Sequence, residues 1–277
     1  KNFNPTLGQL INRIPFSYRP GLSKTYNKRK REISTLEDAS EFDKKKFIFD
    51  RVSTITNFAY ENITFYKEHY DCNNFKPSSL KCFDDLHRIP IINKAILDKY
   101  NIEDRSFKAK DRYLVNTGGS SGTPFSLYIQ PSSMGHEWGH MHYIWEELDY
   151  KPSDFKLVFG GRSDVEDFID YDVVRNQFSV DIYADYELIA KKLKKILKKY
   201  RIKYLHGYPS SIYNFTNYCE NCDLELKKQL QEQLKGVFLG SEYPHEYYRL
   251  KIENVFNVKT ISWYGHTERA VLAYEKS

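Results

Sequence analysis

Thr117-Gly118-Gly119-Ser120-Ser121-Gly122-Thr123-Pro124 separates two strand-like runs, residues 112–115 and 125–129. Glycine permits positive φ angles and lets a ligand approach the backbone closely. Successive backbone N–H groups and hydroxyls in such a loop can wrap a phosphate group. The loop lacks the Gly-Lys-Ser/Thr ending of a Walker A loop and the Gly-x-Gly-x-x-Gly spacing of dinucleotide-binding folds. A plain small-residue hairpin turn is the alternative interpretation.

Two further turns lie nearer the C-terminal end. Gly240-Ser241-Glu242 follows the apolar run 237–239, and Trp263-Tyr264-Gly265-His266-Thr267-Glu268 follows the β-branched run 258–262. In this order the three stretches resemble three motifs of the adenylate-forming (acyl-activating) superfamily. These are its Thr-Ser-Gly-Ser/Thr-Thr-Gly-x-Pro loop, its Gly-Ser/Gly-Glu turn and its Tyr-Gly-x-Thr-Glu motif. An ordered set is far more specific than any single motif.

Within that superfamily the chain resembles the phenylacetate–coenzyme A ligase branch, which includes relatives in capsular polysaccharide biosynthesis. The stretches Phe65-Tyr66, Ile89-Pro90-Ile91-Ile92-Asn93-Lys94 and His206-Gly207-Tyr208-Pro209-Ser210 carry this finer likeness, which runs from about Glu41 onward. Two positions depart from the superfamily pattern: Gly118 stands where Ser is usual, and Phe125 stands where Lys is frequent. A missing Lys removes one charged contact to phosphate.

The resemblance implies ATP-dependent activation of a carboxylic acid as an acyl-adenylate, with transfer to coenzyme A or another acceptor. It implies that Glu268 binds Mg²⁺ and that Thr267 bonds the α-phosphate. The implied nucleotide-binding residues are Thr117, Gly118, Gly119, Ser120, Ser121, Gly122, Thr123, Gly240, Ser241, Glu242, Tyr264 and Gly265. The implied acid-binding residues are His142, Gly207, Tyr208, Pro209 and His266. Aromatic walls favour a flat or apolar acid and histidines favour a polar one, so the acid and its acceptor both stay open.

Family members continue past this point with a ribose-binding Asp, a hinge and a small C-terminal domain that carries a catalytic Lys. None of these features follows Glu268 in the sequence. We therefore expect an incomplete large domain that lacks the C-terminal small domain and is not a complete catalyst.

The order of elements predicts an α/β protein with a largely parallel sheet flanked by helices on both faces. Residues 41–110 have helical spacing, and from residue 113 onward strands and helices alternate. We expect a mainly helical N-terminal segment, 1–110, packed on an α/β nucleotide-binding core, 111–277. Ligands of such sheets bind at the carboxyl ends of the strands, where the turns at 207, 240 and 264 are expected.

The composition argues against two classes of protein, those that bind nucleic acids and those that span a membrane. The chain has 277 residues and a formal net charge of +5, a small excess without the concentrated basic face of a nucleic-acid-binding protein. The lysines between 191 and 203 interleave an apolar helical stripe that contains Ile189, Leu193 and Leu197, which predicts an ordinary solvated helix face. No apolar run is long enough to span a membrane. We expect a cytoplasmic protein whose oligomeric state the sequence leaves open.

Two patterns suggest metal. His136-Glu137-Trp138-Gly139-His140 matches His-Glu-x-x-His, so a zinc metallohydrolase is one alternative function, and a non-catalytic binding module is another. Cys219 and Cys222 have the Cys-x-x-Cys spacing of half a zinc site, and whether they bind a metal stays open.

Overall fold

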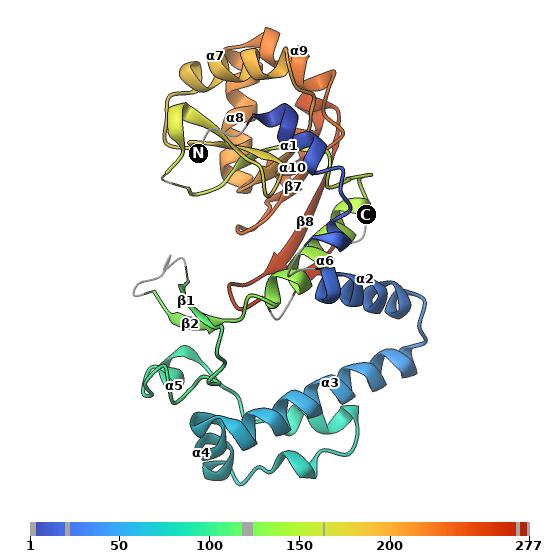
Figure 1. Ribbon diagram of the computed structural model, residues 1–277, viewed down its shortest axis with the longest axis vertical. Helices are drawn as coiled ribbons and strands as arrows, with labels where there is room; N and C mark the ends of the chain where they lie inside the picture. The colour runs from blue at the N-terminus through green and yellow to red at the C-terminus, as the bar shows by residue number, and fades with distance from the viewer. Residues whose placement is uncertain (1–3, 20–22, 118–123, 163, 270–271, 276–277) are drawn as a thin grey trace. The chain divides into compact units, whose positions relative to one another are not determined.

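The computed structural model describes residues 4–19, 23–117, 124–162, 164–269 and 272–275. Its contacts form two compact units, one of residues 1–27 with 135–277 and one of residues 28–134 (Figure 1). The division at residue 110 that the sequence suggests remains a proposal.

The unit of residues 28–134 is built from helices and one hairpin. Tyr70, Phe75 and Leu80 form its buried cluster, against which Phe49 and Tyr60 pack. Its helical elements are the end of α2 (Ser23–Glu37), α3 (Glu41–Asn62), α4 (Thr64–Cys72), η2 (Pro77–Ser79), η3 (Phe83–Arg88) and α5 (Lys94–Leu97). Strands β1 (Tyr113–Asn116) and β2 (Ser126–Ile129) pair antiparallel.

The other unit contains a seven-stranded sheet of order β4-β5-β3-β6-β7-β8-β9. Neighbours from β5 to β8 are parallel, whereas β4 and β9 are antiparallel to their neighbours. The strands are β3 (Phe155–Phe159), β4 (Ile169–Asp172), β5 (Gln177–Val180), β6 (Ile202–Gly207), β7 (Gly236–Leu239), β8 (Lys259–Gly265) and β9 (Leu272–Tyr274). The mixed, mostly parallel α/β sheet predicted from the sequence is therefore confirmed.

Helices cover both faces of this sheet. On one face, Leu205 and Val237 join a large apolar core with residues of α7, α8, α9 and α10. On the other face, Tyr204 and Phe238 pack with Trp145 of α6. The helical elements are α1 (Pro5–Ile11), η1 (Phe16–Tyr18), α6 (Ser133–Glu146), η4 (Glu166–Phe168), α7 (Tyr186–Leu197), α8 (Pro209–Asn221), α9 (Leu224–Gln231) and α10 (Glu246–Phe256).

Local sequence explains where these elements begin and end. Asp185 accepts a hydrogen bond from the Glu187 backbone N–H at 2.7 Å and so caps the start of α7. Pro209 occupies the first turn of α8, where its missing N–H costs nothing. Asn257 adopts a left-handed conformation (φ 54°) that stops α10 before β8.

The sequence analysis did not identify the β4–β5 hairpin or helices α1 and α2. Ile169 and Tyr171 alternate with aspartates in β4, and Phe178 and Val180 alternate with polar residues in β5. This period of two, joined by a short turn at Asn176 (φ 50°), is the signal that would have found the hairpin.

Candidate functional site

The three predicted turns of the larger unit lie at the carboxyl ends of adjacent parallel strands. Gly207 ends β6, Gly240 follows β7, and β8 continues to Gly265. Gly207 is paired with Leu239, and Leu239 is paired with Ser262, so the strand ends are in register. The sheet therefore brings Gly207-Tyr208-Pro209, Gly240-Ser241-Glu242 and Tyr264-Gly265-His266 to one edge, as open α/β sheets do with their ligand sites.

Gly207 brings the backbones at this edge close together. Its φ is +150°, and a Cβ there would lie 2.1 Å from the Phe159 carbonyl oxygen. That oxygen accepts a hydrogen bond from the Tyr208 N–H at 3.0 Å, and the Gly207 carbonyl accepts one from the Gly240 N–H at 3.1 Å. Only glycine fits this position without strain.

The turn after β7 is tied to helix α8. Gly240 is covered by Trp263, whose ring would lie 2.4 Å from an added Cβ, and Ser241 has a positive φ of 68°. The Glu242 carboxylate accepts hydrogen bonds from the Ser210 N–H at 3.2 Å and the Ser210 hydroxyl at 2.6 Å. Glu242 thus caps the positive N-terminus of α8, a contact that the sequence did not reveal.

The segment after β8 carries exposed groups. Tyr264 is 66% exposed, so its ring has a free face. His266 Nδ1 lies 2.9 Å from the Glu268 carboxylate but is not aligned for a hydrogen bond, and Thr267 is half-buried between them. Glu268 keeps nearly half of its side chain exposed. A carboxylate, a hydroxyl and an aromatic ring are therefore accessible within five consecutive residues.

Arg269 is a residue of this segment that the sequence analysis missed. It has a positive φ of 57°, and its Nε lies 2.9 Å from the Glu137 carboxylate of α6. Burial raises the pKa of Glu137, and the Arg269 charge opposes that rise. This ion pair connects the segment after β8 to α6, and the Glu137 carboxylate is thus paired with the Arg269 guanidinium.

His142 is buried within an aromatic cluster. The Tyr26 hydroxyl is 3.0 Å from its Nδ1, and its ring contacts Trp138 and Trp145, which lie four residues before it and three after it on the same face of α6. His142 is 2% exposed.

No role for His206 or Lys156 was predicted from the sequence. His206, beside Gly207, has its ring 5.0 Å from Trp145. Burial, with the Lys156 charge, lowers the pKa of His206 to about 3, so its ring is neutral near pH 7. Within the described residues, His206 Nδ1 and Trp145 Nε1 are buried without a hydrogen-bond partner. Such atoms are costly, so water or a ligand is expected to satisfy them.

The glycine-rich loop belongs to the other unit. Gly118, Gly119, Ser120, Ser121, Gly122 and Thr123 lie outside the described residues, so the structure does not place them. At its base, Thr117 N–H donates to the Phe125 carbonyl at 2.9 Å, and Phe125 N–H donates to the Thr117 hydroxyl at 3.0 Å. Strands β1 and β2 are thus an antiparallel hairpin that this loop connects. The Arg105 guanidinium lies 4.0 Å from the Phe125 ring centre, so a cation stands near the position where Lys is frequent.

The metal alternative finds no support in the geometry. Over the described ranges, no three His, Cys, Asp or Glu side chains are grouped so that they could hold a metal ion. His140 is 8% exposed, and Glu137 faces Arg269. Cys219 is buried and Cys222 is exposed, and both are free thiols. Within the same ranges, no helix is both long enough and apolar enough to cross a bilayer.

Comparison with known proteins identifies the fold. No protein-family model and no curated protein matches this chain. Among solved structures, 2-hydroxyisobutyryl-CoA ligase in the postadenylation state with R3-HIB-AMP is similar, with a TM-score of 0.67, 17% identity, 93% of this chain and 56% of that chain covered. The open conformation of this ligase with 2-HIB-AMP and CoA gives a TM-score of 0.63 at 18% identity, and the match covers 80% of this chain and 53% of the ligase chain. The thioesterification state of the same ligase gives a TM-score of 0.62 at 18% identity, and the match covers 80% of this chain and 49% of the ligase chain.

The chain spans about half the length of these ligases. At such low identity the likeness concerns the fold. This chain therefore has the α/β fold found in part of an adenylate-forming acyl-CoA ligase.

Proposed function

We propose that this protein activates a carboxylic acid with ATP, as part of an adenylate-forming ligase of the phenylacetate–coenzyme A ligase kind. The observation that carries the proposal is the placement of three turns, Gly207-Tyr208-Pro209, Gly240-Ser241-Glu242 and Tyr264-Gly265-His266, at the carboxyl ends of the adjacent strands β6, β7 and β8. The similar fold of 2-hydroxyisobutyryl-CoA ligase, whose structures hold an acyl-AMP and CoA, supports it.

The residues of this edge fit a nucleotide. Tyr264 presents an exposed ring that can stack on adenine. The exposed Glu268 carboxylate is the oxygen ligand that Mg²⁺ prefers. A bound Mg²⁺ would offset negative charge on the phosphates.

The acid has to reach the α-phosphate, where two negative groups meet. Thr267 would donate its hydroxyl to the α-phosphate, and the 117–123 loop would hold the leaving pyrophosphate. His266, Gly207, Tyr208 and Pro209 would border the acid, with His142 behind them in α6. The acceptor would be coenzyme A or another nucleophile.

Nucleotide binding is the first test. We expect ATP or AMP with Mg²⁺ to raise the melting temperature, since a ligand that binds only the folded state stabilises it. Tyr264→Ala should remove most of this shift and leave the unliganded melting temperature nearly unchanged, because the ring is 66% exposed. Tyr183→Ala, at another exposed tyrosine (75%), is the matched control.

Catalysis is tested in a form of the protein that shows carboxylate-dependent ATP–pyrophosphate exchange. Glu268→Gln should lower exchange by about a hundredfold, because it removes a charge that binds the cation. Glu232→Gln, at an exposed carboxylate after α9, should have no effect. Unchanged melting in millimolar ATP would count against the nucleotide site, and unchanged exchange in Glu268→Gln would move the metal site elsewhere.

A further inference from the structure

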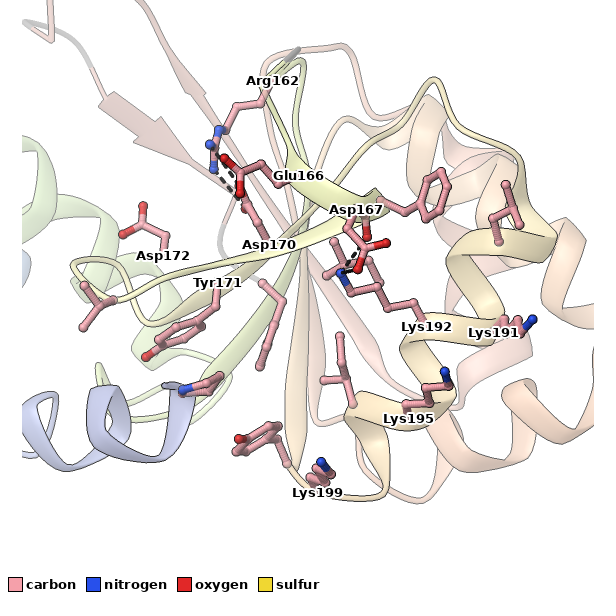
Figure 2. A pocket seen from close by; sticks show the side chains of 18 of the residues that line it. Arg162, Glu166, Asp167, Asp170, Tyr171, Asp172, Lys191, Lys192, Lys195 and Lys199 are labelled. Carbon is pink, nitrogen blue, oxygen red and sulfur yellow. Dashed lines mark hydrogen bonds and ion pairs between the residues drawn. The ribbon is translucent and has the colours of Figure 1, made fainter. Parts of the chain in front are cut away.

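A groove of about 1060 Å³ lies between β4 and α7, away from the turns after β7 and β8. Figure 2 shows lysines from α7 along one side and carboxylates from the η4–β4 segment along the other. Its lining also includes Tyr171, Phe178 and Tyr200. Neither the proposed nucleotide site nor the proposed acid site uses these groups.

The groove opens onto the edge of strand β4. Side chains of a strand point alternately to opposite faces, so a hollow on one face would touch only every second residue. Every residue from Ile169 to Val173 lines this groove. Strand β4 pairs with β5 on one side, and among the described residues no strand pairs with its other side. Within β4 itself the outer N–H and C=O groups are therefore available for another strand, whereas the Val173 carbonyl just beyond it accepts a hydrogen bond from Asn12.

The α7 wall carries unneutralised positive charge. Lys191 and Lys195 are exposed and lie four residues apart on α7, which places them side by side, and the exposed Lys199 follows in the turn after the helix. Among the described residues no carboxylate lies within ion-pair distance of these three lysines. By contrast, Lys192 pairs with Asp167 at 2.6 Å across the groove.

The carboxylates of β4 are already neutralised. Asp170 lies 3.3 Å from Arg162, and Asp172 lies 2.8 Å from Arg175. Both aspartates point to the face of the sheet opposite Ile169, whose side is covered by α7. Within the described ranges, the unpaired charges that a ligand of the groove would meet are thus the three lysines of the row and, at the η4 end, the exposed Glu166.

We propose that β4 and the lysine row form a docking site for an extended acidic segment of a partner protein, which adds to the sheet as a further strand. Alternate residues of a strand repeat every 6.7 Å or so, close to the spacing of about 6 Å between lysines four residues apart on a helix. Acidic residues at every second position would each meet one lysine, while the intervening residues lie beside Asp170 and Asp172. Main-chain hydrogen bonds to β4 supply affinity, and the lysines select the sequence.

A second copy of this chain is a poor occupant of the groove. Pairing β4 with β4 would place Asp170 and Asp172 beside the same residues of the other copy, and like charges opposite one another are destabilising. Small polar residues at the intervening positions of the partner segment avoid that repulsion.

The test uses fluorescent peptides and the whole chain. A short peptide of alternating Glu and Thr should bind, measured by fluorescence polarisation, and added salt should weaken binding because exposed charges are screened. A peptide of alternating Lys and Thr should not bind. The Glu–Thr peptide with alternate backbone amides N-methylated keeps its charges but loses donors, and should bind about tenfold more weakly.

Matched variants locate the site. Lys191→Glu, Lys195→Glu and Lys199→Glu together should weaken binding by about tenfold or more, since they reverse the charge of one wall. Lys198→Glu, Lys228→Glu and Lys235→Glu change the net charge equally at exposed positions outside the groove, and should leave affinity within about twofold. If the first triple variant loses its circular dichroism spectrum, the same three changes to Gln replace it.

Three results would overturn the proposal. The first is no binding of the Glu–Thr peptide at low salt. The second is equal weakening in both triple variants, which would mean general charge attraction. The third is equal binding of the N-methylated peptide or of an acidic helical peptide, which would mean that the edge of β4 is not paired.

Discussion

At the carboxyl end of β6, Gly207 combines an unusual backbone angle with a crowded position. Its φ of +150° and the 2.1 Å approach of a Cβ to the Phe159 oxygen leave no room for a side chain. We expect Gly207→Ala to lower the free energy of unfolding by about 2–4 kcal/mol, because the strand ends must separate. Gly160→Ala is the control, since its Cβ would meet nothing nearer than 3.8 Å. Equal urea midpoints for the two variants would contradict this reading of the turn.

Lys156 is a buried lysine, and its burial leads us to expect that the free energy of unfolding depends on pH. It is 1% exposed, and its Nζ donates to the Tyr150 hydroxyl at 2.7 Å and to the Arg175 carbonyl at 3.1 Å. Burial, opposed in part by Asp172, lowers the pKa of Lys156 to about 7. Above pH 7 the unfolded chain binds a proton at this lysine that the folded chain has released, so this group makes stability rise with pH.

We therefore expect the protein to gain about 1–2 kcal/mol of stability between pH 7 and pH 9 relative to Lys156→Met. Urea unfolding of both proteins across this range measures the difference, and other titrating groups cancel in the comparison. Lys203→Met is a control, because that ammonium is partly exposed and paired with Asp154. Parallel pH curves for wild type and Lys156→Met would show that this lysine keeps an ordinary pKa.

At the scale of elements, one carboxylate connects two of the turns. Glu242, in the turn after β7, bonds both the N–H and the hydroxyl of Ser210 in the first turn of α8. An anion at this end of a helix is stabilised by its partial positive charge. The Glu242–Ser210 hydrogen bonds therefore connect the turn after β7 to the start of α8, beside the proposed nucleotide site.

A double-mutant cycle measures the coupling free energy between Ser210 and Glu242. Ser210→Ala and Glu242→Gln should each destabilise the fold by about 0.5–1 kcal/mol, and the double variant by less than their sum, because both remove one interaction. Additive losses would mean that the two residues act separately. Pairing Ser210→Ala with Glu232→Gln, which lies after α9, should show no coupling.

At the scale of the whole molecule, the N-terminal residues belong to the sheet-containing unit. Asn12 Nδ2 donates to the Gly8 and Val173 carbonyls at 2.9 and 2.8 Å, and Gly8 packs on the Tyr171 ring. Phe16 is 7% exposed and contacts Tyr26. The unit is thus completed by a segment that is far from the sheet in the sequence.

Deleting residues 1–19 should consequently lower the melting temperature by about 5–10 °C, since several buried contacts are lost at once. Adding a synthetic peptide of those residues in trans should restore part of the loss. Asn12→Ala alone should cost about 1–3 kcal/mol, because the Val173 carbonyl loses the donor that the Asn12 side chain supplies. A deletion that melts like the full chain would show that this segment contributes nothing to the fold.

Sequence alone determined the features that depend on neighbouring residues. Glycine-rich turns, apolar strands such as Phe155–Phe159 and the amphipathic α7 follow from local conformational preference and periodicity, so the α/β class and the strand-end turns were predictable. The resemblance of three ordered motifs predicted the candidate site.

Tertiary structure decided what depends on residues far apart in the chain. The edge position of β4, the Glu242 contact to Ser210 and the burial of Lys156 all require strand order and packing to be known. A hydrogen bond across 32 residues leaves no periodic trace in the sequence, since each partner alone looks like an ordinary polar residue. The fold class could therefore be predicted from local sequence patterns. The charged and polar neighbours of each site residue, in contrast, are determined by the tertiary structure.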